Sequence, residues 1–170
     1  MTFGFEKGAD KSKAIKLVAN MQGAIDAYSV KNGVAAIRID VKFSSVVIGT
    51  PSGGRWVNSV RASTYTSLVT DGSGAIFLMA NSPVVQPNGD LIGGLSDEGV
   101  GGVISLSSGR DMVVGHETGH FLGWRSNEYG QDDKGHSIDP NNIMHKPSPS
   151  PGYIDGQYYK KLFDRSTPIQ

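Results

Sequence analysis

The stretch His116-Glu117-Thr118-Gly119-His120 decides how this chain is interpreted. Histidines four positions apart share one face of a helix, so both imidazoles can be directed at one point. A glutamate directly after the first histidine can reach a water bound at that point. The pattern HExxH is therefore typical of a zinc site in which His116 and His120 bind the ion and Glu117 acts as general base.

The residues around the motif predict a half-buried amphipathic helix. Its apolar side is formed by residues at helical spacing, namely Val113, Val114, the methyl group of Thr118, Phe121 and Leu122. Ser108 or Asp111 is expected to cap the beginning of the helix. Gly123 is expected to end it, because glycine most easily adopts the left-handed conformation there. Such an ending turns the chain back, so the third zinc ligand is expected downstream of Gly123.

In these residues the sequence resembles the metzincin clan of zinc endopeptidases, whose pattern is HExxHxxGxxH followed by a methionine turn. His116, Glu117, His120 and Gly123 match that spacing, whereas Ser126 stands where the clan has its third histidine. The resemblance is confined to residues 111–145. Outside that segment only the size and the order of the expected elements agree.

The next histidine along the chain is His136. The residues after it match the matrixin branch of the clan in their order, namely Ser137, Pro140, Ile143 and Met144. The resemblance therefore implies that His136 is the third ligand and that Met144 forms the methionine turn beneath the metal. Residues 124–135 then form an inserted surface loop, for which the leishmanolysin-like branch offers a precedent.

Three other side chains compete for the third ligand position. Glu128 would complete a site of two histidines and one glutamate, although that arrangement leaves the methionine turn unexplained. Asp139 and His145 are the other two candidates. His145 directly follows Met144 and is expected instead to line the cleft.

Composition limits the function further. The 170 residues suit one domain with its own core. A formal net charge of zero offers no electrostatic argument for nucleic acid or anionic membranes as partners. No apolar run approaches the length of a membrane span. The absence of cysteine excludes disulfides within this chain.

The beginning of the chain lacks signal-peptide features, so the location stays open, with secretion or delivery outside the producing cell favoured.

The remaining pattern predicts an α+β fold. An amphipathic helix is expected over residues 10–30, ended by Gly33, and a last helix over residues 154–164. Strand-like runs occupy residues 35–43, 45–48, 57–68, 74–80 and 102–106. We predict a twisted, mainly antiparallel or mixed sheet, packed with the N-terminal helix and the zinc-binding helix and followed by the methionine turn and C-terminal helix. Residues 1–170 form a single catalytic domain, with subdomains 1–123 and 124–170.

The resemblance implies hydrolysis of peptide bonds by water at one catalytic zinc ion. An extended protein or peptide substrate would pair with a sheet edge from residues 91–96 or 99–105. The segment 145–153 would shape the specificity pocket, and Tyr153 is a candidate donor to the oxyanion. Structural calcium is also possible, but its ligands are not assigned, because no EF-hand spacing occurs. Five aspartates in glycine-containing loops are candidates: Asp71, Asp90, Asp97, Asp132 and Asp133.

Two other functions remain open at this point. Ser126, in place of a ligand, favours a binding module that kept a metzincin fold and lost catalysis. The lack of a signal peptide and of cysteine is also compatible with a protease or toxin effector domain of a larger delivered protein. The oligomeric state is open.

Overall fold

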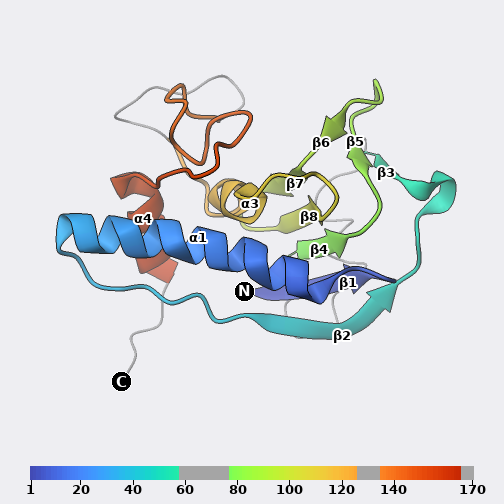
Figure 1. Ribbon diagram of the computed structural model, residues 1–170, viewed down its shortest axis with the longest axis horizontal. Coiled ribbons are helices and arrows are strands. Elements are labelled where there is room, and N and C mark those ends of the chain that lie inside the picture. Colours follow the sequence, from blue (N-terminus) through green and yellow to red (C-terminus); the bar gives the residue numbers. More distant parts are fainter. Residues whose placement is uncertain (58–76, 126–134, 166–170) are drawn as a thin grey trace.

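The computed structural model describes residues 1–57, 77–125 and 135–165. Figure 1 shows the chain as strands and helices with α1 crossing one face of the fold. The described elements are, in chain order, β1 (Thr2–Glu6), α1 (Lys11–Asn32), β2 (Lys42–Ile48), the 3-10 turn η1 (Ser52–Gly54), β3 (Trp56–Val57), β4 (Phe77–Ala80), β5 (Val84–Val85), β6 (Leu91–Ile92), β7 (Gly94–Asp97), β8 (Gly101–Ser105), α3 (Val113–Phe121) and α4 (Gly156–Arg165).

The main sheet has five strands in the order β2-β1-β4-β8-β7. It is mixed, as predicted: the β2–β1, β1–β4 and β4–β8 pairs are parallel, and β7 runs antiparallel to β8. A smaller sheet has the order β3-β5-β6. Strand β7 ends the main sheet, and β8 is paired on both sides. Of the two segments expected to offer a sheet edge to substrate, residues 94–96 lie in the edge strand β7, whereas residues 101–105 lie in the interior strand β8.

The predicted N-terminal helix is confirmed as α1. Asp10 caps it, accepting hydrogen bonds from the backbone N–H of Ser12 at 2.8 Å and of Lys13 at 3.2 Å. Gly33 ends it in the left-handed conformation, with φ of 63°. The buried apolar residues of α1 recur at helical spacing, as expected of an amphipathic helix: Ala14, Leu17, Val18, Met21 and Ile25.

The strand prediction was less accurate. Residues 45–48 lie in β2, as predicted. In the run 74–80 the described residues 77–80 form β4, and residues 102–105 of the run 102–106 lie in β8. The run 35–43 is wrong, since only its last two residues belong to β2. The side chain of Gln22 donates to the carbonyl of Ile37 at 2.7 Å and accepts from the N–H of Ile39 at 2.9 Å. Polar groups of this segment thus bond to a helix instead of a neighbouring strand. Of the run 57–68, all but Val57 lies outside the described residues.

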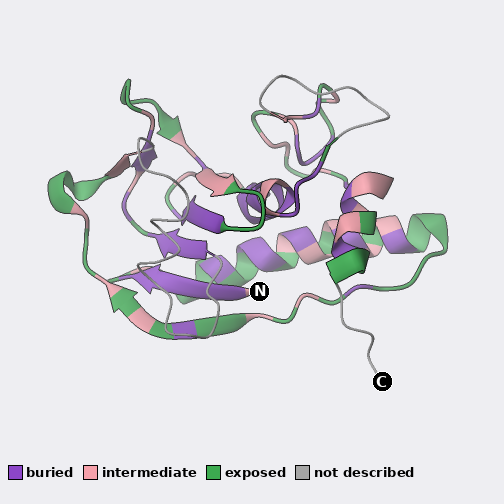
Figure 2. Ribbon diagram, turned by 180° about the vertical axis from the view of Figure 1, so that it is seen from behind, coloured by how far each residue is buried: buried purple, intermediate pink, exposed green. Residues whose placement is uncertain are grey.

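Strand β1 was not predicted. All five of its residues are buried, so it shows no alternation of polar and apolar side chains. It lies between β2 and β4, and Figure 2 shows the buried colour along β1, β4 and β8. A short buried strand of this kind is hard to recognise from periodicity alone.

The motif helix is confirmed as α3, but its predicted cap is wrong. Met112 takes the cap position without a side-chain hydrogen bond. Ser108 bonds instead to the N–H of Arg110 at 3.4 Å, and the Asp111 carboxylate accepts from the hydroxyl of Ser150 at 3.2 Å. Gly123 has φ of 68°, as expected at the end of this helix. The chain then turns back, because the N–H of Trp124 donates to the carbonyl of Gly119 at 2.9 Å.

The helices share one hydrophobic core with the main sheet. It extends from Phe3 in β1 through Met21 in α1 to Tyr158 and Leu162 in α4. The last helix, predicted over residues 154–164, is confirmed as α4. Tyr158 ties α4 to α3 by donating to the carbonyl of Gly115 at 2.7 Å. The division into subdomains 1–123 and 124–170 stays a prediction. No helix in the described part of the chain combines the length and apolar character of a membrane span.

Candidate metal centre and active-site cleft

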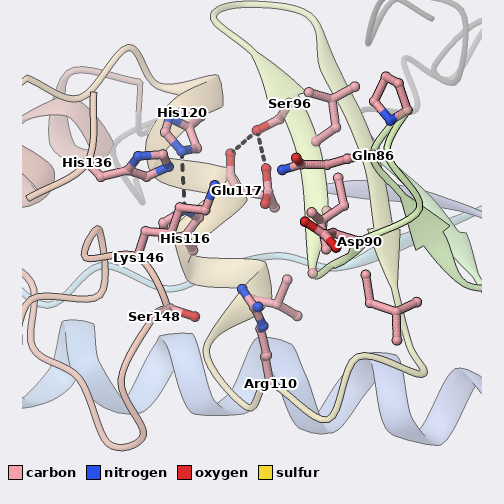
Figure 3. A pocket seen from close by; sticks show the side chains of 17 residues that line it. Gln86, Asp90, Ser96, Arg110, His116, Glu117, His120, His136, Lys146 and Ser148 are labelled. Atoms are coloured by element: carbon pink, nitrogen blue, oxygen red, sulfur yellow. Dashed lines mark hydrogen bonds between the residues drawn. The ribbon is translucent and has the colours of Figure 1, made fainter. Parts of the chain in front are cut away.

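Three histidines converge beside the main sheet. His116 and His120 come from α3, and His136 comes from the segment that follows residues 126–134. One ring nitrogen of each lies within 4.8 Å of the other two, and the Nε2 atoms of His116 and His120 are 3.2 Å apart. Figure 3 shows the three imidazoles facing one another. Within the described ranges no other group of three or more His, Asp or Glu side chains is placed to share an ion.

The ring of His116 is fixed by the methionine turn. Its Nδ1 donates a hydrogen bond to the carbonyl of Ile143 at 2.8 Å. Because a carbonyl can only accept, Nδ1 carries the proton and the lone pair of Nε2 faces the other histidines. Burial lowers the pKa of His116 from 6.5 to about 3, with a smaller contribution from the neighbouring His120. His116 is therefore neutral at physiological pH, which is the form that binds metals.

Met144, the residue expected to form the methionine turn, is fully buried. Gly119 in α3 leaves room for it, since a Cβ at position 119 would overlap the Met144 side chain. The turn itself is held by hydrogen bonds: the N–H of Ser137 donates to the Met144 carbonyl at 3.0 Å, and the N–H of Met144 donates to Oδ1 of Asn142 at 2.9 Å. The turn predicted around Met144 therefore packs directly on the motif helix.

A buried carboxylate supports that turn from below. Asp155, just before α4, is 5% exposed. It accepts hydrogen bonds from Nε1 of Trp124 at 3.0 Å, from Nδ2 of Asn142 at 3.0 Å and from the N–H of Tyr158 at 2.8 Å. One side chain thus joins the chain leaving α3, the methionine turn and the beginning of α4.

Glu117 points into the cleft on the side of the sheet. Its Oε2 accepts a hydrogen bond from the hydroxyl of Ser96 in β7 at 2.8 Å, and Ser96 also lies 2.7 Å from the Glu117 carbonyl oxygen. Gly94 is required beside it, because a Cβ there would come within 2.8 Å of Cγ of Glu117. Burial raises the pKa of Glu117 from 4.5 to about 7, and the Ser96 hydrogen bond opposes that rise.

These groups open into a cleft of about 650 Å³. Its walls are formed by residues between Gln86 and Ser96, by Arg110 and Val113 at the beginning of α3, and by Lys146 and Ser148 after the methionine turn. Figure 3 shows the histidines and Glu117 on one side and Gln86 and Asp90 across from them. The edge strand β7 thus lies along the same cleft as the histidine cluster.

The rival ligands fall into two groups. Glu128 lies outside the described residues. Asp139 and His145 are described and do not join the cluster. Nδ1 of His145 lies 3.2 Å from the carbonyl of Pro147, and the Asp139 carboxylate accepts a hydrogen bond from the Tyr153 hydroxyl. Tyr153 is not among the described residues that line the cleft, so its suggested oxyanion role has no support here.

The calcium candidates gain no support. Asp71, Asp132 and Asp133 lie outside the described residues. Asp90 lines the cleft and is bonded to Nδ2 of Asn88 at 2.8 Å. Asp97 ends β7. Neither joins a cluster of ligating side chains in the described part of the chain.

Sequence reasoning did not find several residues of the site. Ser96, Gly94 and Asp155 act through contacts that no local pattern reveals. Ser96 and Gly94 contact Glu117, and Asp155 accepts hydrogen bonds from Trp124 and Asn142, so these partners lie 13 to 31 positions away. Gly119 offered a signal: a glycine inside a helix costs stability and often marks close packing.

The donor set fits zinc. At Zn–N distances of 2.0–2.1 Å, tetrahedral geometry places ligand nitrogens about 3.3 Å apart. The two Nε2 atoms of α3 are at 3.2 Å, and a ring nitrogen of the third imidazole lies within 4.8 Å of both histidines. Imidazole nitrogen is also a preferred donor for this ion.

Comparison with known proteins supports the fold. No protein-family model matches the sequence, and a comparison with curated proteins gives no match either. The structure is similar to archaemetzincin from Methanopyrus kandleri, with a TM-score of 0.54, 14% identity and coverage of 96% of this chain and 94% of that one. It is also similar to a zinc-dependent peptidase from Methanocorpusculum labreanum, with a TM-score of 0.53, 12% identity and coverage of 95% and 98%.

These matches confirm the predicted α+β fold over nearly the full length of the chain, and the resemblance to metzincins holds at the level of the fold. The described residues place a cluster of three histidines within a fold similar to that of these two proteins. At such low identity the likeness does not extend to substrate or activity. The matrixin-like branch within the clan stays a prediction.

Proposed function

We propose that this protein is a zinc-dependent endopeptidase in which His116, His120 and His136 hold the ion and Glu117 is the general base. One observation carries the proposal: three imidazole nitrogens within 4.8 Å of one another lie beside a buried carboxylate in a cleft bordered by an edge strand. A neutral triad of this kind leaves one position for water or substrate. When bound, zinc would polarise the substrate carbonyl and lower the pKa of a water molecule.

The methionine turn contributes orientation. The Ile143 carbonyl holds the proton on Nδ1 of His116, so Nε2 remains available as a donor to a metal. Met144 and Gly119 keep the turn close to α3. The ring therefore does not have to rotate when an ion binds, which favours a preorganised site.

Glu117 supplies the proton transfer. Its pKa of about 7 suits a base at neutral pH, because a carboxylate of ordinary pKa would be a weaker acceptor. It takes a proton from the water that attacks the peptide carbonyl and passes it to the leaving amine nitrogen. Ser96 holds Oε2 during this exchange, so the carboxylate keeps its direction as its charge changes.

Strand β7 supplies backbone recognition. As the last strand of the five-stranded sheet, it can pair with an extended peptide through main-chain hydrogen bonds. Ser96 belongs to this strand, so the strand that would hold the substrate also contacts the base. Such pairing makes few demands on the side chains of the substrate. The expected substrate is therefore an unfolded or extended segment of a peptide or protein.

The proposal is tested with two preparations, the wild type and Glu117→Gln. Metal content is measured by elemental analysis, and cleavage of casein is followed with and without a chelator. We expect one zinc per chain in both proteins. Hydrolysis should be abolished by the chelator and fall at least about a hundredfold in Glu117→Gln, because removal of a general base costs about 10²–10⁴ in rate.

Three results would contradict the proposal. Zinc-loaded wild type that cleaves no peptide favours a binding module with a metzincin fold. Near-normal activity of Glu117→Gln removes the general-base role. Wild type that binds no zinc argues against the metal centre itself.

A further inference from the structure

The cleft carries an uneven distribution of charge. Arg110, three residues before the first residue of α3, and Lys146, two residues after Met144, both line it. Figure 3 shows them on the side of His116, with Ser148 nearby. Within the described ranges neither cation forms an ion pair with an acidic side chain. Two positive charges therefore line the cleft, and neither is neutralised by an ion pair within the described residues.

Both cations act close to the reacting groups. Both line the same cleft as Glu117 and His116. The aliphatic part of Arg110 lies against Gly93, where an added Cβ would come within 3.2 Å of its Cδ. That contact places the Arg110 side chain between the beginning of α3 and the connection from β6 to β7.

The opposite wall has a different character. Asp90 and Gln86 line it, and the Asp90 carboxylate is held by Nδ2 of Asn88 at 2.8 Å. Figure 3 shows Asp90 across the cleft from Lys146. An anionic group entering the cleft is therefore attracted to one wall and repelled by the other.

We propose that Arg110, Lys146 and Ser148 form a subsite that binds a carboxylate of the substrate. The proposal rests on the proposed endopeptidase function and specifies its substrate class. A guanidinium can bind a carboxylate through two parallel hydrogen bonds, an ammonium adds charge, and a hydroxyl adds a further donor. In a peptide, that carboxylate is either the side chain of Asp or Glu or the chain's own C-terminus.

The experiment compares matched peptides. After mass spectrometry has located one cleaved bond, a Glu, Gln or Lys is placed at each position flanking it in peptides with an amidated C-terminus. A second pair lacks acidic residues and ends in either a free carboxylate or an amide. Values of kcat/KM are measured with the zinc-loaded wild type, and Kd values with zinc-loaded Glu117→Gln, so that binding is read without turnover.

We expect one position at which Glu binds about tenfold more tightly than Gln, with Lys weaker still. Arg110→Gln and Lys146→Gln should each lose most of that preference, and Arg110→Lys should recover part of it. Lys16→Gln, an exposed position on α1, should keep it. If the free C-terminus and not internal Glu is preferred, the same variants identify the terminal carboxylate as the group bound.

The proposal is overturned if no acidic preference exists, or if it survives in both Arg110→Gln and Lys146→Gln, because the carboxylate then binds elsewhere in the cleft. It is also overturned if these variants change only the pH profile. Failure of the endopeptidase function looks different: no peptide is cleaved, yet the zinc-loaded protein still binds the Glu peptide more tightly through Arg110 and Lys146.

Discussion

The two walls of the cleft are built on different principles. The metal-side wall, formed by α3 and the methionine turn, rests on fully buried side chains such as Met144, Trp124 and Tyr158. The strand-side wall, residues 86–96, consists of short strands and turns, and Leu91 there is 68% exposed. The residues expected to act in catalysis are therefore held by packing and hydrogen bonds from several elements. The residues expected to recognise substrate are held by contacts from fewer elements.

The difference has a physical reason. A metal ligand displaced by 1 Å loses its bond, so its orientation must be fixed before the ion arrives. A peptide bound by strand pairing carries its own hydrogen-bonding backbone and tolerates some adjustment of the edge. Substitutions on the metal side should therefore have larger effects than substitutions on the strand side.

The largest effect is expected from His136→Ala, which removes one of the three converging imidazoles. Zinc affinity, measured by competition with a chelating dye, should fall by more than about a hundredfold, since even substitution of a ligand's hydrogen-bond partner costs 10–100-fold. His145→Ala is the matched control, because His145 lies on the same turn outside the cluster. Equal zinc affinity in the wild type and His136→Ala would remove His136 from the site.

A smaller but still large effect is expected from Asp155→Ala. It leaves three buried donors without a partner, each costing about 1–3 kcal/mol, so the free energy of unfolding should drop by about 4 kcal/mol. Urea denaturation of the metal-free protein measures the change. Asp164→Ala, also associated with α4 but half exposed and paired only with Lys160, should change it by less than about 1 kcal/mol. Similar losses in the two variants would show that Asp155 does not hold the metal-side wall together.

The third effect concerns pH. Glu117 has a higher pKa folded, about 7, than unfolded, 4.5, so the folded metal-free protein binds more protons and loses stability as pH rises between these values. Glu117→Gln lacks this loss. It should be more stable than the wild type by up to about 3 kcal/mol at pH 8, and by little at pH 4. His116 titrates with the opposite sign, but it does so in both proteins.

Thermal or urea unfolding of the two metal-free proteins across this range makes the comparison. A difference in stability that does not change between pH 4 and pH 8 would mean that the Glu117 carboxylate is not desolvated in the folded protein.

Local patterns predicted the elements that local forces build. Helical periodicity and backbone preference predicted α1, with its apolar stripe and the glycine that ends it. They also predicted the motif helix α3 and the turn at Gly123. Strands were harder to predict from local patterns. Ile37 and Ile39 bond to Gln22 of α1 and not to a neighbouring strand. Strand β1 is buried along its whole length and therefore shows no alternation. The cap of α3 was missed because Asp111 bonds to Ser150, 39 positions away.

The sequence by itself determined the chemistry available: two histidines and a glutamate on one helical face, a further histidine downstream, and a methionine after it. Residue type and helical spacing are enough for that, since they act over one or two turns. Only the tertiary structure decided the rest: His136 facing α3, Ser96 holding Glu117, and Arg110 with Lys146 in the same cleft. These contacts join segments separated by 16 to 36 positions, and they form because burial of a common core brings those segments together.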